Sequence, residues 1–203
     1  SGHLAPNQPL VEEQLAASLN ISRTPVREAL AILQHEGLIG PRGGRGLYVI
    51  SITRAEFVEM FVANEVIEPY LARRAALYAS PEQLEAIGAA LTRGKESIAR
   101  QNMAGFLRAS RDFHRMVGAA AGNTILADFV LANEERTDMY LLHSGKVIDV
   151  PTMEVSLREH EAIYEALLQH DSEAAERLVI CHAQSLRARL ADLFSPQEDD
   201  PQK

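Results

Sequence analysis

Residues 20–30, with the sequence NISRTPVREAL, decide the fold of the N-terminal part of the chain. Apolar side chains follow at the i, i+3, i+4, i+7 spacing of an amphipathic helix, namely Val26, Ala29, Leu30 and Leu33. Thr24 before Pro25 suits an N-cap followed by proline at the first helical position, with Ser22 as the alternative cap. The segment therefore predicts a helix that begins near residue 24 and ends at Gly37.

The flanking segments complete a small domain. Residues 11–19 have apolar side chains on one helical face, and Asn20 suits the left-handed position that closes such a helix. After the second helix, residues 38–39 and 47–50 are expected to form two short strands around the glycine-rich segment 40–46. Helix, tight turn, helix and hairpin together predict a winged helix-turn-helix domain over residues 1–50.

The rest of the chain is helical in pattern. Helices are expected at 53–79, 81–102, 104–121, 124–145, 151–169 and 172–194, separated by glycine, proline and asparagine breaks. The fold class is therefore mainly α: a winged helix-turn-helix with a small β wing, a linker at 51–54, and an all-α antiparallel bundle over 55–194. The polar, proline-bearing residues 195–203 are expected to form a flexible tail.

Composition and charge limit the class of protein. The 203 residues contain one cysteine, which excludes a disulfide framework, and no apolar run long enough to cross a membrane. We therefore expect a cytoplasmic protein. The formal net charge is −8, with 20 basic and 28 acidic residues in the chain. Residues 1–50 hold four Arg and four Glu, so the whole negative excess lies in the helical part, and this asymmetry predicts two domains with different partners.

Two arginine clusters in the winged domain are candidate DNA contacts. The N-terminal residues of a recognition helix lie in the major groove, where arginine suits guanine or phosphate. This predicts contacts from Ser22, Arg23, Thr24, Pro25 and Arg27. The glycine-rich tip adds Arg42, Gly44 and Arg45, which would approach the neighbouring groove or backbone. An arginine-capped helix and a solvated turn are the alternative reading, which the joint occurrence in one helix-turn-helix-wing pattern disfavours.

These residues resemble the GntR family of bacterial transcriptional regulators. The resemblance rests on residues 20–30, on Glu36-Gly37-Leu38-Ile39 and on the segment 44–49. The helical remainder resembles the FCD domain of the FadR subfamily, through residues 112–114, 122–123, 159–160 and His182. The family's winged domain opens with a helix that precedes residues 2–6, so this chain is expected to begin within that domain. Glu13 occupies a position where many relatives carry a basic residue.

Three histidines are candidate metal ligands: His114, His160 and His182. Each faces apolar neighbours on its own predicted helix, and imidazoles from three helices of a bundle can converge on one ion. From spacing alone, inward histidines are more often core residues with a hydrogen-bond partner. The resemblance implies more, because FCD domains of the metal-binding type place ligands at these positions. A divalent ion, Zn²⁺ or Ni²⁺, is the cofactor expected for an imidazole-rich site.

Two positions depart from the family's pattern. Ser110 occupies the slot of an aspartate ligand four residues before His114, whereas Asp112 is expected to point about 200° away on the helix. Asn64 replaces an arginine that relatives usually carry four residues before a glutamate, here Glu68. Ser110 and Asn64 are therefore candidate effector contacts. Cys181, next to His182, is expected to be a small buried residue rather than a ligand.

Three functions were compared. The first is a transcriptional regulator, most plainly a repressor, whose homodimer binds double-stranded operator DNA and responds to a small effector, expected to be a carboxylate, at the metal-containing pocket. The second is a metal-dependent hydrolase that uses the three histidines to activate water. No general base converges on those histidines, which disfavours it. The third is a dimerisation or scaffolding bundle, in which the arginine clusters would have no role.

Overall fold

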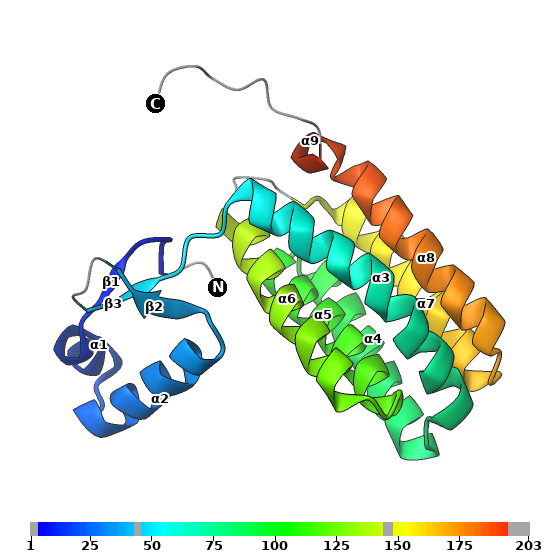
Figure 1. Ribbon diagram of the computed structural model, residues 1–203, viewed down its shortest axis with the longest axis horizontal. Coiled ribbons are helices and arrows are strands. Elements are labelled where there is room, and N and C mark those ends of the chain that lie inside the picture. Colours follow the sequence, from blue (N-terminus) through cyan, green and yellow to red (C-terminus); the bar gives the residue numbers. More distant parts are fainter. Residues whose placement is uncertain (1–3, 43–45, 144–147, 195–203) are drawn as a thin grey trace.

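The computed structural model describes residues 4–42, 46–143 and 148–194. The described chain forms a small α/β unit followed by a bundle of long helices (Figure 1). The predicted contacts Gly44 and Arg45 and the tail 195–203 lie outside the described residues. No helix in the described ranges is both long enough and apolar enough to span a bilayer.

The N-terminal unit is a winged helix-turn-helix, as the sequence predicts. Its helices are α1 (Glu12–Leu19) and α2 (Arg23–His35), and its wing consists of β2 (Ile39–Pro41) and β3 (Leu47–Val49). A third strand, β1 (Pro9–Leu10), was not predicted, because two residues give no alternation to detect. The three strands form an antiparallel sheet in the order β1-β3-β2, in which Pro9 pairs with Tyr48 and Gly40 with the same residue on the other side.

The helix ends of this unit follow backbone chemistry. Asn20 adopts the left-handed conformation with φ of 54°, and its amide N–H closes α1 on the carbonyls of Ala16 and Ala17. The second helix begins at Arg23, one residue before the start expected near residue 24. Ser22, the alternative cap expected from the sequence, is therefore the N-cap residue in place of Thr24, and its backbone is extended. Pro25 lies within the first turn, where its missing N–H leaves no helical hydrogen bond unmade.

The bundle contains six long helices, with bounds close to those expected from the sequence: α3 (Arg54–Tyr78), α4 (Pro81–Ala99), α5 (Met103–Ala120), α6 (Thr124–His143), α7 (Val150–Leu168) and α8 (Ser172–Arg189). The last predicted helix is broken at Leu190, after which α9 (Ala191–Phe194) follows. Capping boxes at Thr53 and Ser80 fix the starts of α3 and α4. The linker therefore ends at Thr53, one residue earlier than predicted.

One continuous apolar core holds the bundle together. Phe57, Ile87, Phe113 and Ile163, from four different helices, are almost completely excluded from solvent. Burial of each such side chain stabilises the fold by about 1.5–3 kcal/mol relative to exposure. In Figure 1, α3 crosses the bundle and lies against α6 on one side and α8 on the other, with α5 behind it. Residues on α3, α5, α7 and α8 can therefore meet inside the bundle.

The two units touch through the C-terminal end of α6. Met139 packs against the apolar core of the winged unit, which includes Leu10, Val26 and Leu30. Four residues later, His143 places Nε2 3.0 Å from the carbonyl oxygen of Leu4, while its Nδ1 lies 2.8 Å from the carbonyl of Met139. One helix of the bundle thus carries both the packing and the hydrogen bond that join it to the winged unit.

Candidate DNA-binding surface and effector pocket

The predicted recognition residues form an exposed surface at the start of α2. Ser22, Arg23, Thr24, Pro25 and Arg27 are all solvent-exposed, and Arg42 is exposed beyond the end of β2. On the opposite side of the same helix, Val26 and Leu30 are buried in the core of the winged unit. Ala29, expected to face inward, is exposed instead. The helix thus presents two arginines to solvent while its apolar side fixes its orientation.

Two carboxylates of α1 lie beside these arginines. The Arg27 guanidinium donates through Nε and Nη2 to the carboxylate of Glu12, with a shortest distance of 3.0 Å. This hydrogen bond, opposed by slight desolvation, lowers the pKa of Glu12. Arg23 lies 4.0 Å from Glu13. Because these pairs are exposed, each stabilises the fold little and leaves the arginines available to another anion.

The three predicted histidines meet inside the bundle. His114 lies on α5, His160 on α7 and His182 on α8, and one ligand nitrogen of each lies within 4.8 Å of the others. Their ring centroids are 4.5–5.6 Å apart. His160 also stacks on Phe113, which fixes its ring plane. Among the described residues this cluster is the one group of His, Cys, Asp and Glu side chains close enough to hold a metal ion.

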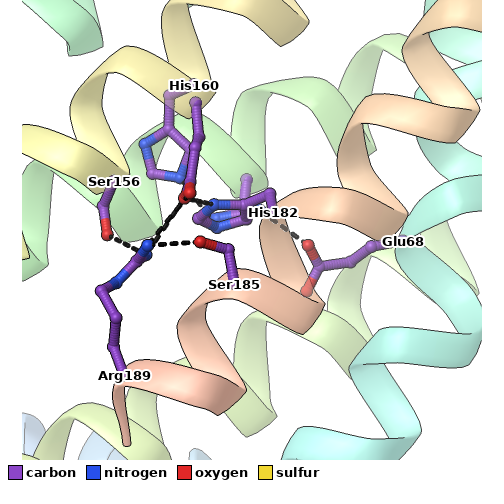
Figure 2. Close-up of polar contacts among 8 residues, drawn as sticks. Glu68, Ser156, His160, His182, Ser185 and Arg189 are labelled. Carbon is purple, nitrogen blue, oxygen red and sulfur yellow. Dashed lines mark hydrogen bonds and ion pairs between the residues drawn. The ribbon is translucent and has the colours of Figure 1, made fainter.

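Carboxylates hold two of these imidazoles from behind. Nδ1 of His114 donates to Glu68 across 2.7 Å, and Nδ1 of His182 donates to Glu159 across the same distance. The Glu159 carboxylate in turn accepts two hydrogen bonds from Arg189, which also donates to Ser156 and Ser185 (Figure 2). A carboxylate on Nδ1 leaves Nε2 as the free nitrogen and fixes the ring, which is the arrangement that supports metal-bound histidines.

The three imidazoles differ in pKa because their surroundings differ. Burial acts to lower the pKa of His114, but the Glu68 carboxylate outweighs it and raises the pKa to about 9. Burial lowers the pKa of His160 well below its usual value and, to a lesser degree, that of His182. The hydrogen bonds from His182 and Arg189 outweigh burial at Glu159 and lower its pKa to about 2. In the absence of a metal, His114 is therefore the protonated member of the cluster.

A pocket extends from the histidines toward the C-terminal half of α6. Ser110 and Asn64, the two predicted effector contacts, both line it, together with His114 and His182. Asp112 is turned to the outside of α5, where it pairs with Arg93 and Arg115, as its helical position predicts. The apolar part of the pocket wall consists of Phe57, Phe61, Phe106, Leu107, Leu141, Ile148, Leu186 and Leu190.

Several residues of this site were not identified from the sequence. No acidic group was expected to converge on the histidines, yet Glu159 on α7 reaches His182 on the neighbouring helix. Glu134 and Asp138 on α6 line the pocket, and burial raises the pKa of both carboxyl groups, that of Asp138 strongly. Their spacing of four residues places them on one face of α6, but this spacing alone does not tell a pocket face from a solvent face. Cys181, predicted to be buried, is exposed because α8 turns it away from His182.

Comparison with known proteins identifies the two units separately. The FCD domain family matches residues 59–185, and the gntR family of bacterial regulatory proteins matches residues 1–49. The chain belongs to the GntR family of bacterial transcriptional regulators. As a GntR regulator with an FCD domain it is a transcriptional regulator and not an enzyme, so the hydrolase alternative is not favoured.

Individual relatives agree with this assignment. The chain is 29% identical to the HTH-type transcriptional repressor RspR of Escherichia coli K12, over 97% of this chain and 85% of RspR. It is 30% identical to the repressor NanR of Enterobacter sp. 638, over 87% of this chain and 74% of NanR. The fold is shared with E. coli McbR/YncC at a TM-score of 0.79 and 20% identity, covering 96% and 92% of the two chains. A GntR regulator from Rhodococcus sp. RHA1 gives 0.75 at 22% identity, over 94% and 90%.

Proposed function

We propose that this GntR regulator is a repressor that binds operator DNA as a homodimer and releases it, or binds it more tightly, when a small effector enters the pocket between α3, α5, α6 and α8. The observation that carries the proposal is the exposed arginine face of α2 on a winged unit that belongs to this family. Its relatives RspR and NanR are both repressors. Because operator DNA lies in the bacterial cytoplasm, the protein would act there.

A divalent metal ion fits the histidine cluster. His114, His160 and His182 would hold it, since three neutral imidazoles whose ligand nitrogens lie within 4.8 Å of one another suit Zn²⁺ or Ni²⁺. When bound, such an ion supplies a Lewis-acidic centre for an oxygen donor of the effector, for which a carboxylate is the natural group. Glu68 and Glu159 would fix the rings, and Ser110, in place of a fourth anionic ligand, leaves room for the effector.

An apolar stripe on the outside of the bundle supports the homodimer. Apolar side chains are exposed along α3 and on α6, namely Val62, Val66, Tyr70 and Leu77 on α3 and Ile125 and Phe129 on α6. Val66 is 73% exposed and Ile125 80% exposed. Figure 1 shows α3 and α6, the helices that carry these residues, side by side in the bundle. A second copy of the chain is the partner that two-fold operator symmetry calls for.

Helix α6 provides a route from the pocket to the winged unit. Asp138 and Leu141 line the pocket, whereas Met139, the neighbour of Asp138, packs against the core of the winged unit. A ligand that repositions Asp138 therefore acts on the residue next to Met139, which makes the contact between the two units. Such a ligand changes DNA affinity only if it binds the two arrangements of the winged units with different affinity.

Selection of duplexes from a random-sequence pool tests the proposal. We expect the wild-type protein to enrich an inverted repeat whose half-sites are spaced by about one helical turn, roughly 34 Å. The variant Arg23→Ala/Arg27→Ala should enrich no sequence, while Arg177→Ala, which removes an exposed arginine of the bundle, should behave as wild type. Failure of the wild-type protein to enrich any sequence would contradict the proposal.

A further inference from the structure

The polar end of the effector pocket is lined by carboxylates. Glu65, Glu68, Glu134 and Asp138 all contribute to its wall, whereas no arginine or lysine does so among the described residues. Apart from the histidine cluster, the charged groups that a free carboxylate effector would meet in this wall are therefore carboxylates. On α3, the position where relatives usually carry an arginine is occupied by Asn64, which is buried in the pocket wall.

Three of these carboxylates already have a cationic partner. Glu65 accepts from Arg187 across 3.0 Å, Asp138 from Arg111 across 2.7 Å, and Glu68 from His114. Glu134 differs from them. Its one hydrogen bond within the described chain comes from the neutral amide of Asn64, whose Nδ2 lies 3.3 Å from Oε1. The positive groups that attract Glu134 at longer range, His114 and Arg111, are each bonded to another carboxylate.

The amide of Asn64 is held in the orientation that serves Glu134. Its Oδ1 accepts a hydrogen bond from Nδ2 of Asn133 across 3.0 Å, within the buried contact between α3 and α6. Its own NH2 group is therefore directed to Glu134. A neutral donor at this distance satisfies one oxygen position, but no cation is in direct contact with the Glu134 carboxylate among the described residues, in a pocket lined largely by apolar side chains.

The histidine cluster does not use this carboxylate. The group of side chains near enough to share one ion consists of the three imidazoles and includes no carboxylate of α6. The pocket therefore offers two kinds of polar group, the imidazoles that suit a metal-bound oxygen donor and the Glu134 carboxylate, which suits a cation. An ammonium group pairs with a carboxylate more strongly here than in water because the surrounding aromatic and aliphatic side chains lower the local dielectric.

Building on the proposed function, we infer that the effector carries a protonated amine that binds Glu134, in addition to the carboxylate that faces the histidine cluster. The effector class is then an amino-carboxylate with separated charges rather than a dicarboxylate or a simple carboxylate. Asn64 acts as a positioning residue that orients Glu134 for this amine, and the apolar wall around Phe57 and Phe106 covers the carbon skeleton.

Isothermal titration of the zinc-loaded protein with three matched probe series tests the inference. The series are unbranched ω-amino acids of four to six carbons, the dicarboxylates of the same lengths, and the corresponding monocarboxylates. We expect at least one ω-amino acid to bind about tenfold more tightly than its matched dicarboxylate and monocarboxylate. In Glu134→Gln this preference should fall to less than about twofold, whereas Glu135→Gln, which removes the neighbouring charge outside the pocket, should retain it.

A second variant should reverse the binding preference at the same site. In Asn64→Arg the new guanidinium would pair with Glu134, so the preference should reverse in favour of the dicarboxylates. Each comparison is made between probes on one and the same protein, so a general loss of stability cannot imitate the result. Equal or tighter binding of dicarboxylates to the wild-type protein, or binding of no ω-amino acid, would overturn the inference. Operator and zinc binding measured in parallel would show whether the proposed regulator function stands regardless.

Discussion

The Nε2 atoms of His160 and His182 lie 3.2 Å apart, across the contact between α7 and α8. Because Nδ1 of His182 donates to Glu159, its Nε2 has a free lone pair, so the short contact requires that His160 donate an N–H to it. In the metal-free protein the two rings therefore satisfy each other. A metal ion held by both Nε2 atoms would replace the hydrogen between them. Metal binding is therefore sensitive to the protonation of these imidazoles.

Zinc binding should release protons in a pH-dependent manner. The pKa of His114, raised to about 9, means that this ring is protonated at pH 7.5, whereas a metal ligand must be neutral. We expect release of about one proton per zinc ion at pH 7.5, falling toward zero above pH 9. Titration calorimetry in buffers of different ionisation enthalpy measures this number. Zinc binding at pH 7.5 without proton release would show that His114 is not a ligand.

Removal of the carboxylate behind His182 should weaken the metal site. In Glu159→Gln a neutral amide replaces the anionic acceptor of the His182 Nδ1–H group, and Arg189 loses its ion pair. Loss of such a supporting carboxylate typically costs about 10–100-fold in metal affinity. The matched control is Glu161→Gln on the same helix, which pairs with Lys95 at the surface and should leave zinc affinity as in wild type. Equal zinc affinity of both variants would contradict the supporting role of Glu159.

Reversal of charge at Glu13 should tighten DNA binding. The side chain is exposed beside Arg23, so its negative charge opposes an approaching phosphate. In Glu13→Arg the repulsion is replaced by one further phosphate contact in each copy, and the slope of log K against log salt for the dimer should steepen by about 1.8. Fluorescence anisotropy over a range of salt concentrations measures both effects. An unchanged slope would mean that the N-terminal end of α1 does not face the DNA backbone.

A charge within the apolar stripe should disrupt the homodimer. Val66 is largely exposed, so Val66→Glu leaves the bundle core intact but buries a carboxylate in the proposed interface of each copy. We expect multi-angle light scattering to report a dimer for the wild-type protein and a monomer for this variant. Leu168→Glu, on an exposed position of α7, is the control and should remain dimeric. If Val66→Glu also elutes as a dimer, the interface lies elsewhere.

Much of this architecture could be predicted from the sequence because it depends on local chemistry. The spacing of Val26 and Leu30 defines the buried side of α2, and capping residues such as Thr53 and Ser80 mark helix starts. The convergence of His114, His160 and His182 was predicted from the family resemblance, because a single inward histidine on a helix is equally compatible with a core position.

The remainder depends on how helices pack, which periodicity does not reveal. Strand β1 is two residues long and forms because β3 offers it an edge. Whether a glutamate on α6 faces solvent or a pocket depends on its neighbours in the bundle, so Glu134 could not be distinguished from Glu135 with assurance. The same limit explains Glu159, whose partner lies 23 residues away on another helix.

Binding of the protein to its selected inverted-repeat duplex, compared with a scrambled duplex of equal length, tests the central claim most directly. We predict that anisotropy titrations show at least about 10³-fold tighter binding to the selected duplex, with affinity falling steeply as salt rises. Arg23→Ala should weaken the specific complex by about 1–3 kcal/mol and leave the scrambled duplex much less affected. Equal affinity for both duplexes, or an Arg23→Ala variant that binds as wild type, would contradict the account.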